Sequence, residues 1–133
     1  MSDLLFVDTG GFYSFLSQSD VHHREAEKLL LKPTAKMTSN YVLDELVTLL
    51  SVRGHKDIAL SFGEKLRLGT FAGYHFLTPT EEEKAWHLYK KYKDHDLSFT
   101  DCTTLILLKE HRVSRLVSFD QELIKLTHAF LIV

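Results

Sequence analysis

The stretch Leu4-Leu5-Phe6-Val7-Asp8-Thr9-Gly10 runs four apolar residues directly into a carboxylate and a chain-turning glycine. An unbroken apolar run of this length is typical of a strand covered on both faces, as in a parallel α/β sheet. Such sheets bind ligands in the crevice beyond the carboxyl ends of their strands. Asp8 is therefore predicted at the edge of that crevice, although an aspartate here could equally cap a short helix beginning near Gly10.

Length and composition favour one cytoplasmic domain spanning residues 1–133, since single domains cluster at about 100–150 residues. No apolar stretch approaches the roughly 20 residues that cross a bilayer, and Met1-Ser2-Asp3 lacks the basic start of a signal peptide. The single cysteine, Cys102, excludes an internal disulfide and a cysteine-built metal site. A net charge of −2 argues against a protein that coats nucleic acid indiscriminately, so any nucleic-acid contact must be local.

Strand and helix patterns alternate along the chain, which predicts an α/β fold with a central, mainly parallel sheet and helices on both faces. Strands are expected at 4–7, 36–38, 74–77, 116–117 and 130–133. Helices are expected at 12–16, 21–31, 41–52 and 55–68, at 98–111, and after Asp120. One further helix carries Trp86 and Leu88, and the sequence Thr80-Glu81-Glu82-Glu83 predicts a capping box that opens it.

Two adjacent acids in the predicted helix 41–52 fall on different faces at 100° per residue. Asp44 shares its side with polar residues and is expected in solvent. Glu45 instead shares its side with Tyr41, Val42, Leu49 and Val52, the stripe expected to pack against the sheet. Because a carboxylate on a buried face is costly unless it is paired or bound to a metal, the position of Glu45 indicates a functional role. The alternative is a Glu near the helix start that reaches solvent.

Two later acids repeat these positions. Asp101 lies on the apolar side of the helix that begins after Ser98, opposite Thr103, which is expected to face solvent. Ser98 and Asp101 can also be interpreted as a capping pair, without any chemistry. Asp120 follows the strand Leu116-Val117 as Asp8 follows the first strand, and it too could be a helix cap.

Together, two acids follow strands and two lie near helix starts, and in a parallel sheet both kinds of position open onto the same carboxyl edge. Four carboxylates within several ångströms would raise one another's pKa unless a cation holds them ionised. Oxygen-only ligation suits Mg²⁺ or Mn²⁺, which act at phosphate groups. Such an ion neutralises charge on a phosphodiester and lowers the pKa of an attacking water.

The chain resembles the PIN-domain family of metal-dependent ribonucleases, and specifically its small single-domain members, the VapC-type toxins. The resemblance covers essentially the whole chain. Four fragments carry it, in this order and at these separations: Val7-Asp8-Thr9, Ser39-Asn40-Tyr41-Val42-Leu43-Asp44-Glu45-Leu46, Leu97-Ser98-Phe99-Thr100-Asp101-Cys102 and Val117-Ser118-Phe119-Asp120. The implied fold is a PIN-like three-layer α/β/α domain.

The resemblance also implies roles for particular residues. The catalytic acids that hold Mg²⁺ or Mn²⁺ would be Asp8, Glu45, Asp101 and Asp120. Thr100 and Ser118 would be hydroxyl neighbours that orient carboxylates or waters. The family further implies endonucleolytic cleavage of RNA, a homodimer, and a small antitoxin protein that blocks the site. The main alternative is the same fold with a site that no longer cleaves, used as an RNA- or protein-binding module.

Other motifs are interpreted as structural. His95-Asp96 resembles the pair of HD phosphohydrolases, but the other seven histidines are expected in scattered elements rather than around one metal. Cys102, on an apolar helix, is expected to be a packed core residue. A phosphatase that uses a strand-end aspartate would need a second acid at the position of Gly10. Basic residues at helix junctions are interpreted as solvated helix ends, with phosphate contacts as the alternative.

Overall fold

The computed structural model describes residues 4–131, with side chains up to residue 128. Its sheet consists of β1 (Leu5–Val7), β2 (Lys36–Ser39), β3 (Gly73–His75) and β4 (Arg115–Val117), in the order β3-β2-β1-β4. Every neighbouring pair is parallel. The carboxyl ends of the strands therefore meet at one edge, as the sequence predicts.

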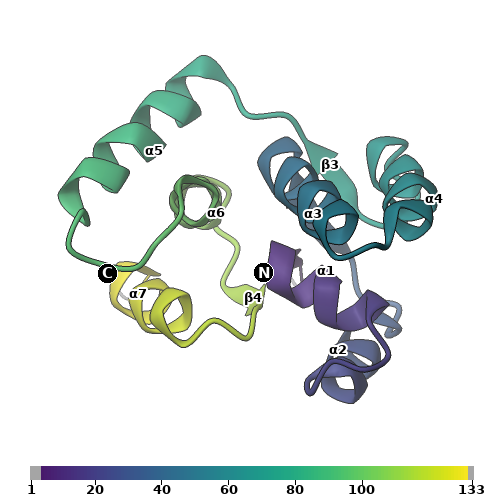
Figure 1. Ribbon diagram of the computed structural model, residues 1–133. Helices are drawn as coiled ribbons and strands as arrows, with labels where there is room; N and C mark the ends of the chain where they lie inside the picture. Colours follow the sequence, from purple (N-terminus) through teal and green to yellow (C-terminus); the bar gives the residue numbers. More distant parts are fainter. Residues whose placement is uncertain (1–3, 132–133) are drawn as a thin grey trace.

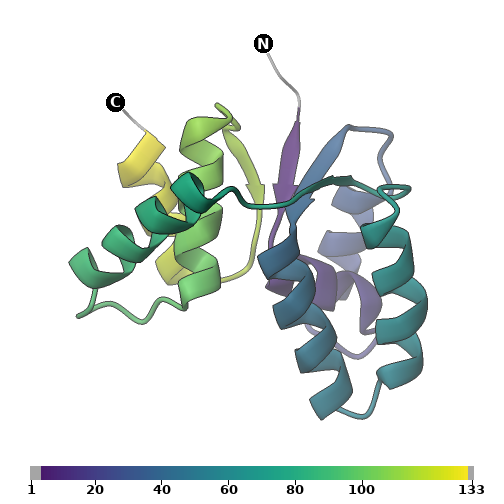
Figure 2. The same ribbon diagram turned by 90° about the horizontal axis from the view of Figure 1, so that it is seen from above.

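Seven helices connect and cover these strands within the described residues. Figures 1 and 2 show α5, α6 and α7 gathered on one side of the sheet and α1 to α4 on the other. This is the predicted α/β arrangement with helices on both faces. No helix within residues 4–131 combines the length and the apolar character that a bilayer crossing requires. The helices are α1 (Thr9–Leu16), α2 (His23–Leu30), α3 (Asn40–Val52), α4 (Lys56–Arg67), α5 (Pro79–Lys91), α6 (Phe99–Glu110) and α7 (Gln121–Leu131).

Two local expectations are wrong. The helix α5 is capped by Thr78, whose side chain accepts from the Glu81 backbone while Glu81 reaches back to the Thr78 N–H. Pro79 fits the first helical position because it has no N–H that would need a hydrogen-bond partner there. The capping residue is therefore Thr78, two residues before the predicted Thr80. The predicted terminal strand 130–133 begins inside α7, since the helix runs to Leu131, and residues 132–133 lie outside the described part.

The helix α6 occupies the centre of the molecule, because every residue from Cys102 to Leu108 is buried. Thr103, expected on the solvent side, is fully buried, and its hydroxyl donates to the Thr100 carbonyl at 2.6 Å. Leu107 and Leu108 join the core formed with β1 and α3, whereas Leu105 packs with α5 and α7. A helix that is buried on all sides has no face that must be hydrophilic. The prediction from helical periodicity, which assumed one face in solvent, therefore underestimated how much of α6 is buried.

Gly11 lets α1 lie close to β4. A Cβ at this position would meet the Val117 carbonyl oxygen at 2.7 Å and the Val7 Cγ1 at 3.1 Å, and backbone cannot rotate away as a side chain can. We expect Gly11→Ala to lower the free energy of unfolding by about 1–3 kcal/mol, the usual cost of overpacking. Urea denaturation measures this change.

The neighbouring Gly10 provides the matched control. A Cβ there would approach only Asp8 Oδ1, at an ordinary 3.7 Å, so Gly10→Ala should stay within about 1 kcal/mol of the parent. Equal destabilisation by both substitutions would mean that close contact with β4 is not what requires glycine at position 11.

Candidate active site

All four acids predicted from the sequence line one cleft at the carboxyl edge of the sheet, with a volume of about 420 Å³. Asp8 follows β1, Glu45 lies in the second turn of α3, Asp101 in the first turn of α6, and Asp120 directly precedes α7. Residues from four separate segments therefore converge. The full lining is Asp8, Thr9, Gly10, Glu45, Leu49, Asp96, Ser98, Asp101 and Asp120.

Asp8 both caps a helix and faces the cleft, so the two interpretations of this residue hold together. It is only 6% exposed, and its Oδ1 accepts from the Gly11 N–H at 2.7 Å. Burial raises its pKa to about 7; hydrogen bonds from Ser118 and Gly11 oppose this rise, whereas the charges of Asp101 and Asp120 add to it. The protonated and ionised forms of this carboxyl group are therefore close in free energy at neutral pH, and a nearby positive charge would favour the ionised form.

Asp101 also has two functions. Its carboxylate accepts from the Ser98 backbone N–H at 3.0 Å, and the Ser98 hydroxyl accepts from the Asp101 N–H, which completes a capping box. Burial raises its pKa to about 6, the hydrogen bond from Ser98 lowers it, and the charges of Glu45 and Asp120 raise it further. The helix cap therefore fixes the orientation of a carboxylate that still senses two other acids of the cleft.

Glu45 lies beside the buried stripe of α3 rather than within it. That stripe consists of Val42, Leu46 and Leu50, and Val52, expected inside, is 80% exposed. Glu45 is half-buried and lines the cleft, while Asp44 is exposed, as predicted.

The two predicted hydroxyl neighbours differ in position. Ser118 is buried beneath the cleft, where its Oγ accepts from the Asp120 N–H at 3.2 Å and its hydroxyl also bonds Asp8. It thus links two of the acids. Thr100 is half-buried and is not among the residues that line the cleft, so its orienting role stays a prediction.

Asp96 is a fifth acid of the cleft that the sequence interpretation missed, because it considered Asp96 only as part of the His95-Asp96 pair and interpreted that pair as structural. The chain from Asp96 to Ser98 leads into α6, which brings the side chain to the edge where the other acids lie. The signal was present in the sequence, since Asp96 stands two residues before a helix cap. His95 faces elsewhere and pairs with Glu122, so the two residues do not act as an HD pair.

The donors of this cleft fit a hard divalent cation. The charged groups that line it are all carboxylates, and two of them, Asp8 and Asp101, have raised pKa values that a bound cation would lower. Thr9 also lines the cleft, and its Oγ1 is buried and has no hydrogen-bond partner within the described part of the chain. Among the described side chains, the cleft lining contains no histidine and no cysteine, the ligands that softer metal ions prefer.

Cys102 is fully buried, and burial raises the pKa of its thiol to about 11, with the charge of Asp101 adding to the rise. A thiol of this kind is not a nucleophile at neutral pH. The prediction that Cys102 is a packed core residue is therefore confirmed.

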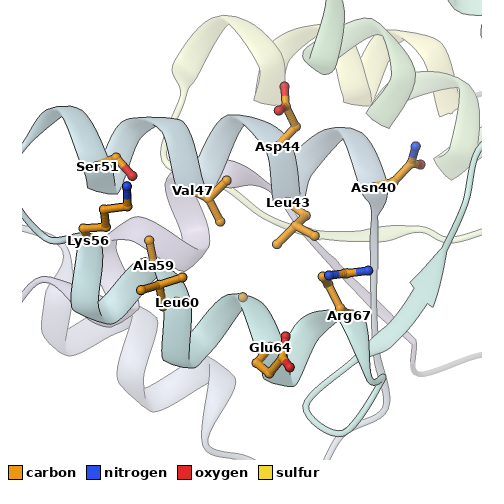
Figure 3. A pocket seen from close by; sticks show the side chains of 11 residues that line it. Asn40, Leu43, Asp44, Val47, Ser51, Lys56, Ala59, Leu60, Glu64 and Arg67 are labelled. Carbon is orange, nitrogen blue, oxygen red and sulfur yellow. The ribbon is translucent and has the colours of Figure 1, made fainter.

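A second cavity of about 440 Å³ lies between α3 and α4, and Figure 3 shows its lining. Its lining includes the aliphatic residues Leu43, Val47 and Leu60. Its charged residues are of both signs, with Asp44 on α3 and Lys56, Glu64 and Arg67 on α4. Without a converging set of acids, this cavity does not share the chemistry of the acidic cleft.

Known proteins share this architecture. The chain is 32% identical over 119 residues to the 23S rRNA-specific endonuclease VapC20 of Mycobacterium tuberculosis, which covers 88% of this chain and 89% of that protein. It is 28% identical over 120 residues to a VapC ribonuclease of Archaeoglobus fulgidus, covering 86% and 75%. The crystal structure of M. tuberculosis VapC20, described as a sarcin-ricin loop cleaving toxin, matches with a TM-score of 0.85 at 28% identity, over 92% of this chain and 94% of that one. The family model for the PIN domain matches residues 5–129, and the chain therefore belongs to the PIN-domain family.

Proposed function

We propose that this chain is a metal-dependent endoribonuclease that hydrolyses RNA phosphodiester bonds in the cytoplasm as a single domain. The observation that carries the proposal is the convergence of Asp8, Glu45, Asp101 and Asp120 in one cleft at the carboxyl edge of the sheet. The acids come from four separate segments of the chain, and two of them, Asp8 and Asp101, have raised pKa values that a bound cation would lower.

Under this proposal, the four acids hold Mg²⁺ or Mn²⁺, and Asp96 adds a further carboxylate to the lining of the same cleft. When bound, the ion supplies charge neutralisation at the phosphodiester and a more acidic bound water. The chain itself supplies fixed orientation: Gly11 N–H and the Ser118 hydroxyl hold Asp8, and Ser98 N–H holds Asp101. Preorganised ligands of this kind do not have to be ordered when the substrate arrives.

The names of the relatives support a proposal for the substrate class. VapC20 is named for cleavage of 23S rRNA and of the sarcin-ricin loop, and we propose structured RNA, with 23S rRNA tested first, as the substrate of this chain. We further propose that the chain is the toxin of a toxin-antitoxin pair, forms a homodimer, and is blocked by a small antitoxin protein. The VapC relatives support this assignment.

The direct test incubates the purified protein with 23S rRNA and with a mixed RNA pool, in Mg²⁺, Mn²⁺ or EDTA, and maps the new ends. We expect cleavage only with metal, and a loss of at least about 100-fold in rate for Asp101→Asn, because each 1.4 kcal/mol of lost transition-state stabilisation is tenfold in rate. Cleavage that persists in EDTA would contradict the metal site. Cleavage by neither protein in any metal would favour a binding module without activity.

A further inference from the structure

Two histidines that are far apart in the sequence meet around one glutamate, away from the acidic cleft. His75 is the last residue of β3, Glu81 lies in the first turn of α5, and His111 follows the last residue of α6. His75 Nε2 lies 2.7 Å from Glu81 Oε1, and His111 Nε2 lies 3.0 Å from Glu81 Oε2. None of the three lines the cleft of Asp8 and Asp101. The two histidines belong to different elements, as the sequence interpretation expected, and the fold brings them together at Glu81.

We propose that His75, Glu81 and His111 form a binding site for one divalent ion of the zinc class. One ligand atom from each residue can be chosen so that all lie within 4.8 Å of one another. Four-coordinate Zn²⁺ holds its ligands about 2.0–2.1 Å away, which places neighbouring ligand atoms about 3.3 Å apart. The two nitrogen–oxygen contacts of 2.7 and 3.0 Å lie just below that spacing, whereas the limit that holds for all three ligand atoms is 4.8 Å. The side chains therefore have to rearrange to place all three atoms at that spacing around one ion.

The donor set selects the class of ion. Two imidazoles and one carboxylate suit Zn²⁺, Co²⁺ or Ni²⁺, whereas Mg²⁺ prefers oxygen ligands. Three protein ligands leave a fourth position for water, and the 36% exposure of the His111 side chain leaves an entry path from solvent. The acidic cleft and this site therefore offer different chemistry to different metals.

The carboxylate of Glu81 is already oriented and charged. The capping box fixes it, because Oε1 also accepts from the Thr78 N–H at 3.0 Å. Burial raises its pKa, but hydrogen bonds from His75, Thr78 and His111 outweigh that effect and bring the pKa to about 2. Since a carboxylate only accepts, the Nε2 atom of each histidine carries the proton in these contacts, and a metal ion would replace both protons.

A hydrogen-bonded triad without metal is the simpler explanation, and comparison with other pairs argues against it. His23 with Glu27 and His87 with Glu83 are side chains one turn apart on the same helix, and each involves one imidazole. Within the described residues, His75, Glu81 and His111 form the one group of three histidine, cysteine, aspartate or glutamate side chains whose ligand atoms all lie within 4.8 Å of one another, and the acids of the cleft do not meet this limit. These elements flank the connection that crosses from β3 to α5 (Figure 2), so a bound ion would tie that connection to α6.

The test measures Zn²⁺ binding to the chelator-treated full chain by calorimetry, with excess Mg²⁺ present. Loss of an outer hydrogen-bond partner already weakens metal binding by about 10–100-fold. We therefore expect Glu81→Gln and His75→Ala to lose one equivalent of Zn²⁺, with at least about 100-fold weaker binding. Gln at position 81 preserves the capping box, so the helix start is maintained. His87→Ala, which removes an exposed histidine of the same helix, should bind as the parent does.

A second measurement uses the parent chain alone and does not depend on any variant folding. Long-range proton-nitrogen NMR spectra should show the Nε2 signals of His75 and His111 shifting together as one equivalent of Zn²⁺ is added, with the other six histidines unchanged. Co²⁺ at the same site should give the strong visible absorption of a four-coordinate ion. Unchanged His75 and His111 signals at saturating Zn²⁺, or equal Zn²⁺ binding by parent and Glu81→Gln, would overturn the proposal.

Discussion

Replacing Glu45 by glutamine is expected to slow metal-dependent RNA cleavage by about 10²–10³-fold, since a ligand that supports charge stabilisation at the reacting phosphate contributes several kcal/mol. Asp44→Asn, one residue earlier, should cleave at close to the parental rate. The two acids lie on the same helix, but Glu45 lines the acidic cleft while Asp44 borders the other cavity with Arg67 (Figure 3). Initial rates at saturating Mn²⁺ or Mg²⁺ measure the difference.

This pair of variants controls for effects other than metal ligation. Both substitutions remove one negative charge from α3, so any general change in RNA attraction should be shared. Gln and Asn also preserve side-chain length and hydrogen-bonding capacity. A metal titration should show weaker activation for Glu45→Gln alone. Equal loss of activity in both variants would point to long-range charge rather than to the cleft, and undiminished activity in Glu45→Gln would remove this residue from the site.

The second large effect concerns stability in the absence of metal. The Asp8 pKa is about 7 in the folded protein and 3.8 in the reference state. Between these values the folded chain binds a proton that the unfolded chain has released, so the free energy of unfolding should fall as the pH rises from about 4 to about 7. The gap between the two pKa values corresponds to a loss on the order of 4 kcal/mol. Asp101, with a pKa of about 6, contributes in the same direction.

Asp8→Asn should therefore stabilise the metal-free protein at pH 8 while abolishing cleavage. Asparagine can still accept from the Gly11 N–H, and it removes the buried charge. Urea denaturation in EDTA between pH 4 and pH 8 should show a falling profile for the parent and a flatter one for the variant. Saturating Mg²⁺ or Mn²⁺ should stabilise the parent at pH 8 and leave the variant unchanged.

The exposed Asp44→Asn variant supplies the control here too, and it should follow the parental pH profile. A parent chain in EDTA that gains stability between pH 5 and pH 8 would show that Asp8 ionises freely and needs no cation. If Asp8→Asn stabilised the protein but still cleaved RNA, the buried charge of Asp8 would lower stability without being needed for catalysis.

The sequence by itself determined the four strands of the sheet and their parallel arrangement, because strand and helix patterns alternate along the chain with clear stop signals. It also identified the four acids, since each interrupts an apolar pattern or follows a strand. Asp8 and Asp101 are both helix caps and cleft residues. Each of these two residues caps a helix and also lines the cleft. The sequence analysis set helix capping and a role in the cleft against each other as alternatives, but both hold for the same side chain.

Tertiary structure alone decided the remaining features. Helical periodicity placed Thr103 in solvent, but a helix at the centre of the molecule is packed on every side. Asp96 belongs to a connection without periodicity, and only the path of the chain into α6 brings it to the cleft. His75 and His111 are 36 positions apart and meet because β3, α5 and α6 converge on Glu81. Local patterns report what each residue does within its own element, whereas contacts between elements depend on how the whole chain folds back on itself.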